Sequence, residues 1–292
     1  MYKQIAANKR NTVIIMLGFV LLIAAIGGIF AYAFNDWWIT IYVVVIALIY
    51  AIVQYYASAS LAVAMTGAKQ IQKKDNPRLY NTVENLAITA GLPMPKVYII
   101  EDSAPNAFAT GRDPEHAVVA ATTGLLDIMD NKELTAVMAH ELSHVKNYDI
   151  RVSMITFGLV CIVGFIADLG VRMMWLTSNH DDDDNSPIGL IVVVLTSLLA
   201  PIVASVAQMA VSREREYLAD ASAAHLTRYP EGMIAALKKL DTHSRPMRHQ
   251  NPATEALFIN NPLRKGAINN LFSTHPPIEK RIERLEHGKE KF

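Results

Sequence analysis

Apolar and polar positions divide this chain into long uncharged runs and ordinary charged sequence. The runs without Asp, Glu, Lys or Arg are 11–35, 37–68, 152–167 and 185–212. A helix needs about 20 apolar residues to cross the hydrocarbon layer of a bilayer. The predicted membrane spans are therefore about 13–34, 38–57, 152–172 and 188–210. Charged residues still make up 18% of the whole chain, so the sequence between the runs is charged enough to form a soluble domain.

The third and fourth spans carry features that the first two lack. The third run is short and reaches span length only if Asp168 and Arg172, one helical turn apart, pair or snorkel near its far end. Pro201 predicts a kink in the fourth span. A shallow hairpin that enters the bilayer without crossing it is the alternative for this pair.

Basic residues flank the first hairpin on both sides. They are Lys3, Lys9, Arg10, Lys69, Lys73, Lys74 and Arg78. Because basic flanks stay in the cytoplasm, the pattern predicts a multi-pass protein of the plasma membrane with a cytoplasmic N-terminus. The predicted organisation is a hairpin over 1–68, a first polar half over 69–151, a second hairpin over 152–212 and a second polar half over 213–292. Both hairpins return the chain to one side, so the two polar halves can fold together.

The polar halves predict a mixture of helices and short strands. Strand-like runs occur at Lys96–Ile100, Asn106–Thr110 and His116–Thr122. Helical spacing occurs at Pro77–Ala90, 213–228, 231–242 and from about Pro277. The expected fold class is therefore a multi-pass α-helical membrane protein with an α+β cytoplasmic domain, built of helices and a small sheet.

The charge balance and the cysteine content exclude several kinds of site. The net charge is zero and the pI is about 7.1, so no basic field favours a nucleic acid, and we expect no such partner. Cys161 is the single cysteine and cannot form a disulfide within the chain. Any metal site must therefore use histidines and carboxylates.

A helix is predicted to begin at Asn131, its expected N-cap. It carries a compact group of candidate metal-binding and catalytic residues. His140 and His144 are four residues apart, so both imidazoles lie on one face and can reach a single ion. Glu141 between them is placed to take a proton from a water on that ion. Ser143 is interpreted as a small packing residue, since no base is apparent for a serine nucleophile. Two ordinary helix histidines are the alternative interpretation.

A second predicted helix supplies carboxylates at the same spacing. Glu216 and Asp220 are four residues apart and share one face. Zinc held by two histidines needs a third protein ligand and an open position for water, and Glu216 is the candidate ligand. Asp220 can accept a hydrogen bond from the non-coordinating nitrogen of a ligand histidine, with His140 the expected partner. Without the first motif, Glu216 would be interpreted as a solvated residue.

Several segments together resemble a known family. They are His140–Asp149 (HELSHVKNYD), Ser212–Asp220 (SREREYLAD) and Asn106–Gly111 (NAFATG). In this order, with a hairpin between the two zinc motifs, they resemble the HtpX membrane metalloproteases, relatives of the Ste24-type proteases. The resemblance covers nearly the whole chain. It implies one Zn²⁺ per chain bound by His140, His144 and Glu216, with Glu141 as general base and Asp220 supporting a ligand.

The resemblance also implies roles for two further segments. Asn106, Ala107, Phe108, Ala109 and Thr110 would form an edge strand on which an extended substrate pairs; a purely structural strand is the alternative. Ser273–Pro277 (STHPP) resembles the C-terminal motif of the family. His275 within it would donate to the oxyanion or cap the following helix.

The implied activity is hydrolysis of peptide bonds in membrane proteins by a zinc metalloendopeptidase of a bacterial plasma membrane. If the helices run straight out of the membrane, the site lies within about 10 Å of its cytoplasmic face. Expected partners are the lipid bilayer, membrane-protein substrates and other proteases of membrane quality control under stress. One alternative is an inactive zinc-binding scaffold, which would have no need of Glu141. The other is a transporter, which would need a polar pathway that the spans do not show.

Overall fold

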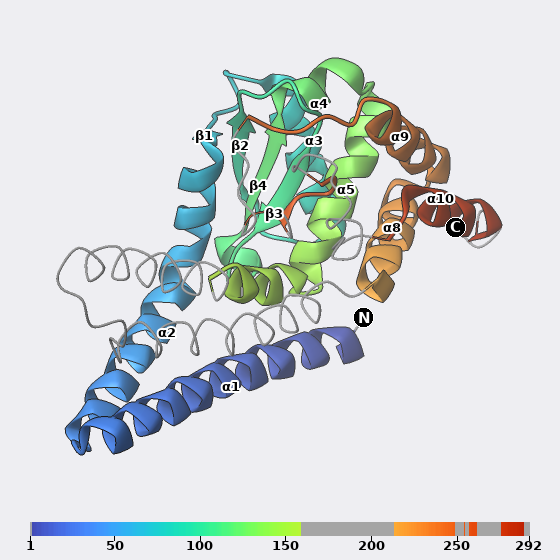
Figure 1. The fold of residues 1–292 in the computed structure, drawn as a ribbon. Coiled ribbons are helices and arrows are strands. Elements are labelled where there is room, and N and C mark those ends of the chain that lie inside the picture. Colours follow the sequence, from blue (N-terminus) through green and yellow to red (C-terminus); the bar gives the residue numbers. More distant parts are fainter. Residues whose placement is uncertain (1, 159–212, 249–253, 255–256, 262–275, 289–292) are drawn as a thin grey trace, which may run out of the picture.

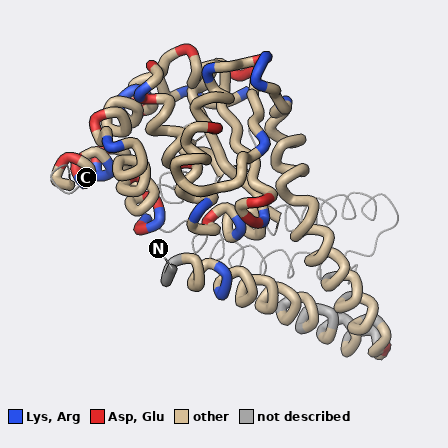
Figure 2. Tube along the Cα trace, turned by 180° about the vertical axis from the view of Figure 1, so that it is seen from behind, with Lys and Arg blue, Asp and Glu red and all other residues tan. Residues whose placement is uncertain are grey.

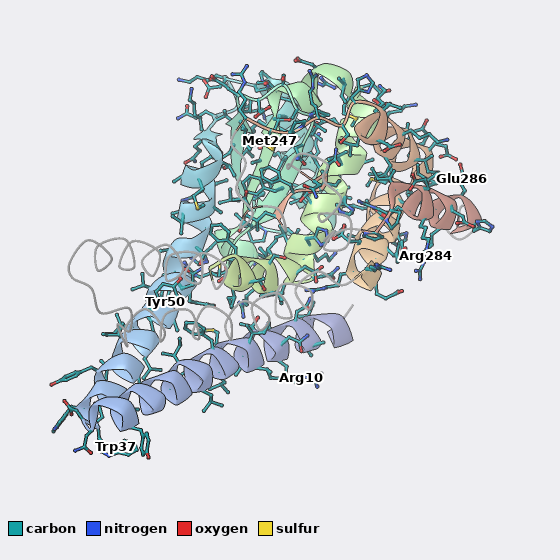
Figure 3. The ribbon with its side chains drawn as sticks, in the orientation of Figure 1. Arg10, Trp37, Tyr50, Met247, Arg284 and Glu286 are labelled. Atoms are coloured by element: carbon teal, nitrogen blue, oxygen red, sulfur yellow. The ribbon has the colours of Figure 1, made fainter. Side chains whose placement is uncertain are left out.

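Two long helices form a hairpin at the start of the chain (Figure 1). In this computed structural model, which describes residues 2–158, 213–248, 254, 257–261 and 276–288, they are α1 (Tyr2–Phe34) and α2 (Trp38–Thr66). Trp37 lies at the tip of the hairpin, far from the rest of the chain (Figure 3). Charged residues lie mainly outside the hairpin, most of whose length carries none (Figure 2). Both ends of the hairpin return to the polar part of the chain.

The predicted membrane spans can be compared with the helices of the described residues. The first lies within α1, which is helical throughout. The second was predicted to end at residue 57, but α2 continues to Thr66, where Gly67 ends it with φ 66°. Among the described residues one helix is long and apolar enough to cross a membrane, over Thr40–Thr66 with a mean hydropathy of 1.9. The third span beyond residue 158 and the whole fourth span lie outside the described residues.

A small mixed sheet lies at the centre of the polar domain. Its strands are β1 (Lys69–Gln70), β2 (Lys96–Ile100), β3 (Ala107–Thr110) and β4 (Val118–Thr122). They lie in the order β1-β2-β4-β3, so β3 is an edge strand. The pair β2–β4 is parallel, whereas β1–β2 and β3–β4 are antiparallel. The three strand predictions are confirmed apart from their first residues. β3 begins at Ala107 and not Asn106, and β4 begins at Val118 and not His116, which ends a 3-10 helix (Pro114–His116).

Among the described residues, six labelled helices accompany this sheet, besides the helical segment over 149–158. They are α3 (Pro77–Ala90), α4 (Thr123–Ile128), α5 (Asn131–Lys146), α8 (Arg213–Thr227), α9 (Pro230–Thr242) and α10 (Ile278–Gly288). Their buried faces meet in one hydrophobic core that contains residues from both polar halves of the sequence, such as Leu134 and Val137 from the first and Ala223 and Leu237 from the second. The two halves therefore share one core (Figure 1).

Local sequence explains where the helices begin. Asn76 accepts a hydrogen bond from the backbone N–H of Leu79 and is followed by Pro77, which suits the first turn of α3. The N-cap of α5 is Asp130, one residue before the predicted Asn131. Asp130 and Glu133 form a reciprocal capping box, which satisfies backbone donors at both ends of the first turn.

Helix α5 and the helical segment that follows it are not one straight helix. Helix α5 ends at Lys146, and Tyr148 adopts a left-handed conformation with φ 62°. A new helical segment over 149–158 then leaves in another direction (Figure 1). The expected distance of about 10 Å to the membrane face assumed a straight helix. It does not apply, because the chain turns at Asn147 and Tyr148.

Candidate metal centre

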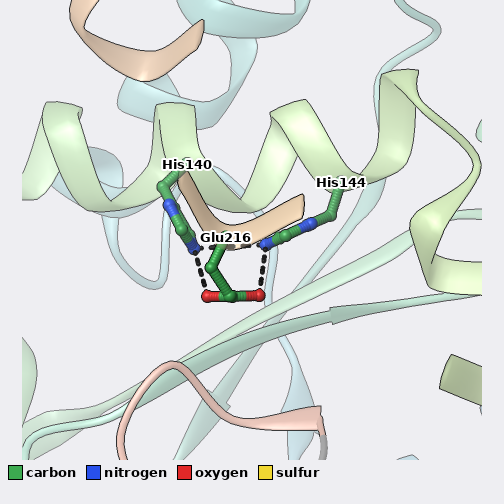
Figure 4. Close-up of side chains that lie close together, drawn as sticks. All are labelled: His140, His144 and Glu216. Atoms are coloured by element: carbon green, nitrogen blue, oxygen red, sulfur yellow. Dashed lines mark hydrogen bonds and ion pairs between the residues drawn. The ribbon is translucent and has the colours of Figure 1, made fainter. Parts of the chain in front are cut away.

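Two helices bring three donor side chains to one point (Figure 4). His140 and His144 project from successive turns of α5, and Glu216 reaches them from α8. The two Nε2 atoms are 3.2 Å apart. The carboxylate of Glu216 places Oε2 3.6 Å from Nε2 of His140 and Oε1 3.5 Å from Nε2 of His144. Glu216 lies 72 positions after His144 and 76 after His140, yet the three side chains form a single cluster.

The donor atoms of this cluster fit a tetrahedral zinc ion. Nδ1 of His140 and Nδ1 of His144 each lie at hydrogen-bonding distance from a carboxylate. In the neutral form that binds a metal, each imidazole carries one N–H, so this pairing would leave both Nε2 atoms as bare acceptors. Acceptors this close repel each other unless a cation lies between them. Ligand atoms about 2.0–2.1 Å from a tetrahedral zinc are separated by about 3.3 Å, close to the spacing found here.

A buried ion pair orients the first histidine. Asp220 Oδ1 lies 3.0 Å from Nδ1 of His140. Arg281 of α10 donates to both oxygens of Asp220, over 2.7 and 2.8 Å. Burial opposes ionisation of Asp220, yet Arg281 holds its pKa at about 2. The carboxylate therefore stays charged and can fix the ring orientation of His140.

A different carboxylate orients the second histidine. Oδ2 of Asp149 lies 3.1 Å from Nδ1 of His144. Asp149 follows the left-handed turn at Tyr148, which directs its side chain back toward α5. Both histidines therefore have a carboxylate behind the ring, an arrangement that fixes the tautomer and raises the basicity of a metal ligand.

Glu141 lies beside the three donors with a buried side chain. It is 3% exposed and lines one pocket together with Ala109, His140, His144 and Glu216. Burial raises the pKa of Glu141, while the neighbouring histidines lower it. A carboxyl group with a raised pKa in a cleft is suited to exchange a proton during a reaction.

The edge strand β3 reaches this pocket, but only at one end. Asn106 O accepts from Thr122 N of the sheet, whereas Ala107 O accepts from Ile259 N on the opposite side. Peptide groups alternate along an antiparallel strand, so those of Ala107 and Ala109 face the edge opposite β4. At the Asn106–Phe108 end this edge is already paired with residues 258–260, because the Asn106 side chain exchanges two hydrogen bonds with the Asn260 backbone.

The other residues of the site were predicted in part. The structure buries both Glu216 and Asp220, so neither is the solvated residue considered as an alternative. His275 lies outside the described residues. Asp149 and Arg281 were not predicted to support the site. Asp149 carried no signal beyond its place in the motif run, and Arg281 lies on a helix whose charge pattern indicates a solvated surface.

We expect zinc binding to release a proton from His140. Burial opposes protonation of His140, but its hydrogen bonds with Asp220 and Glu216 outweigh burial and raise its pKa to about 9 in the metal-free protein. Zinc must therefore displace that proton at neutral pH, and its apparent affinity should rise with pH up to about 9. Calorimetric titration in buffers of different ionisation enthalpy should detect about one released proton per zinc at pH 7. Release near zero at this pH would contradict the assignment.

Loss of Arg281 should destabilise the fold strongly. Arg281→Met leaves the buried carboxylate of Asp220 without its cation, a change that typically costs about 3–5 kcal/mol. A thermal unfolding midpoint lower by roughly 6–20 °C is expected. Arg284→Met is the matched control, because Arg284 lies on the same helix with its side chain 57% exposed (Figure 3). Equal midpoints for the two variants would show that the buried pair does not stabilise the site.

Comparisons with known proteins agree with this geometry. The model of peptidase family M48 matches residues 73–289. A "Protease HtpX homolog" of Tropheryma whipplei (strain Twist) is 52% identical over 293 residues and covers 100% of both chains. Another from Ligilactobacillus salivarius (strain UCC118) is 47% identical, covering 98% of this chain and 99% of the relative.

A solved structure shares the fold. The crystal structure of S. mikatae Ste24p aligns with a TM-score of 0.53 and 18% identity, over 98% of this chain and 67% of that chain. The family match includes both helices of the metal cluster, and the relatives extend over the full length. The chain therefore belongs to peptidase family M48, among its HtpX-type metalloproteases.

Proposed function

We propose that this metalloprotease is a zinc-dependent endopeptidase anchored in a bacterial plasma membrane by several spans, which hydrolyses membrane proteins at the cytoplasmic face. One observation carries the proposal: three donors 3.2–3.6 Å apart lie beside the buried carboxyl of Glu141. A structural zinc site uses all four positions for protein ligands, whereas a catalytic site keeps one for water. Within the described residues, the cluster comprises three such donors, His140, His144 and Glu216.

The residues of the pocket have distinct chemical tasks. When bound, zinc supplies Lewis acidity at the scissile carbonyl and makes a water molecule easier to deprotonate. Glu141 takes the proton of that water and delivers it to the leaving amine. Asp220 and Asp149 keep the two histidines oriented with their Nε2 atoms toward the ion. No covalent intermediate with the protein is required.

The Ala109–Thr110 end of β3 offers a place for the substrate backbone, because no described residue pairs with its outer edge. Ala109 lines the pocket with the metal cluster, and its peptide groups face the strand edge. An extended peptide that pairs with this edge would place its backbone along the cluster by β-augmentation. Because residues 258–260 pair with the Asn106–Phe108 end, the substrate would use the Ala109–Thr110 end.

The hairpin supports membrane proteins as the substrate class. Ile15, in the N-terminal half of α1, packs with residues 152–155 just after the motif helix, and Ala62 near the end of α2 packs with Phe108 of β3. Both ends of the hairpin thus contact elements of the site. A substrate held in the same membrane would present its cytoplasmic loops or tails to this pocket. A role in quality control under stress, together with other membrane proteases, rests on the family resemblance.

The alternative is an inactive zinc-binding scaffold on the membrane. A scaffold needs the three ligands but gains nothing from Glu141, whose burial costs free energy. Glu141 therefore favours an enzyme over a scaffold.

Cleavage in reconstituted vesicles tests the proposed substrate class. The full-length zinc-loaded chain is incorporated with a single-span protein that carries an unstructured cytoplasmic tail, and the same tail is supplied free in solution. The anchored tail should be cut at least tenfold faster, because the membrane raises its effective concentration. Equal rates would contradict a membrane-protein preference. Failure to cut either substrate would contradict the proposed endopeptidase activity.

A further inference from the structure

The carboxylate of Asp149 lies between the metal centre and the first helix of the chain. Its Oδ2 atom lies 3.1 Å from Nδ1 of His144. Its Oδ1 atom accepts a 2.7 Å hydrogen bond from Nδ2 of Asn8 in α1. Asp149 is 4% exposed and Asn8 is 3% exposed, so water does not compete freely for either group. A continuous hydrogen-bonded path thus links α1 to a metal ligand.

The turn after α5 creates this path. A residue five positions after His144 in a continuous helix would lie about 140° around the axis and face away from it. The left-handed conformation of Tyr148 breaks the helix and returns Asp149 to the ring. Nδ2 of Asn8 also donates to the backbone carbonyl of Asn147 over 2.9 Å. One amide group therefore holds both the turn and the carboxylate that the turn presents.

Side-chain packing fixes α1 against this turn. Ile15 of α1 is buried in a cluster with Val152, Met154 and Ile155, which directly follow Asp149. The ammonium group of Lys9 lies 4.4 Å from the centre of the Tyr148 ring. The beginning of α1 is thus held on the segment that carries Asp149, and a shift of the helix would move the Asn8 amide.

The two histidines differ in what supports their carboxylates. Asp220 behind His140 is held by Arg281, a residue of the protease domain. Asp149 behind His144 is held by Asn8, with Arg215 of α8 3.8 Å from the same oxygen. Support for the second ligand therefore comes in part from a helix that the apolar pattern assigns to the membrane anchor.

We propose that Asn8 is a positioning residue for the metal centre, acting through Asp149 on His144. The inference rests on the proposed zinc site and adds a task for α1 beyond anchorage. Groups that orient a metal ligand typically change metal affinity or activity by about 10–100-fold when removed. Loss of the Asn8 amide frees Asp149 to rotate away from the ring, so the geometry of His144 loosens while substrate contacts stay unchanged.

The test compares Asn8→Leu with Asn11→Leu in the full-length chain. Asn11 is an exposed asparagine one turn along the same helix, so the control makes the same chemical change away from the turn. Zinc dissociation constants are measured by competition with a chromophoric chelator. The visible absorption of the cobalt-substituted protein reports ligand geometry, and peptide hydrolysis separates kcat from KM.

Asn8→Leu should bind zinc at least tenfold more weakly than Asn11→Leu. Its cobalt absorption should shift, and kcat should fall while KM stays unchanged. Asn8→Ser removes the amide with less disturbance of packing and should change zinc affinity in the same direction, which keeps the test decisive if the leucine variant misfolds. Zinc affinities within twofold of the control and an unaltered cobalt spectrum would overturn the inference.

These outcomes are separable from failure of the proposed function. A wild-type chain that binds no zinc would overturn both the zinc enzyme and the positioning role. Normal zinc binding and hydrolysis by the wild type, with Asn8 and Asn11 variants alike, would overturn only the role of Asn8. A weaker affinity in both variants to the same extent would also overturn it, since the effect would then belong to α1 in general.

Discussion

Replacing Glu141 with glutamine is expected to lower kcat by about 10²–10⁴-fold while the chain keeps its zinc. The amide preserves the volume of the buried side chain but cannot accept and return a proton. Glu141 lies beside the three donors without belonging to the metal cluster, so metal content should not change. Rates of peptide cleavage and zinc per chain, measured on one preparation, check both parts.

Ser143→Ala is the matched control for that substitution. Ser143 lies between the two histidines, and its hydroxyl donates to the backbone carbonyl of Ala139 over 2.8 Å within the helix. It should therefore retain wild-type kcat. An active Glu141→Gln variant together with an inactive Ser143→Ala variant would contradict the water-activating mechanism and indicate a serine nucleophile.

Replacing Glu216 with alanine is expected to weaken zinc binding by more than about 100-fold, beyond the usual effect of a residue that only supports a ligand. The substitution removes one of three donors and leaves Arg281, whose Nη1 lies 3.8 Å from the Glu216 carboxylate, facing the site. Zinc should be lost on dialysis against a chelator, and hydrolysis with it.

Glu214→Ala provides the comparison on the same helix. Glu214 is a carboxylate two residues earlier with its side chain 73% exposed, paired at 3.4 Å with Arg284. Its loss should leave zinc content and cleavage unchanged, because an exposed ion pair contributes little. A Glu216→Ala chain that keeps stoichiometric zinc through dialysis would remove Glu216 from the ligand set.

Local periodicity made the centre of the site predictable from the sequence. Residues four apart on a helix share a face, so His140 with His144, and Glu216 with Asp220, follow from spacing alone. The strands at 96–100 and 118–122 were likewise visible as short apolar runs. Long-range pairing of α5 with α8 could not be derived from spacing and came from the chemical need for a third ligand.

The supporting residues could not be predicted because their partners are distant in the chain or depend on a turn. Arg281 lies 61 positions from Asp220, and Asn8 lies 141 positions from Asp149. Asp149 reaches His144 only because Tyr148 leaves the helical conformation. No local sequence pattern predicts such a contact, since arginines on charged helices and asparagines before apolar runs are common.

The extent of the apolar pattern was also an incomplete guide to the helices. The uncharged run continues to residue 68, but the span length of about 20 residues placed the predicted span at 38–57. Helix α2 continues to Thr66, and Ala62 near its end packs with Phe108. Hydropathy measures what a bilayer accepts, whereas the end of a helix depends on capping and packing. The two-residue strand β1 and the six-residue helix α4 gave no periodic signal, because both are too short to show one.

Removal and return of the metal tests the central claim most directly. The full-length chain is stripped with a chelator, assayed for peptide cleavage, and titrated with Zn²⁺. Cleavage should vanish in the stripped protein and rise linearly until one Zn²⁺ per chain has been added, as expected for a single three-donor site. Undiminished cleavage by the metal-free chain would contradict the account.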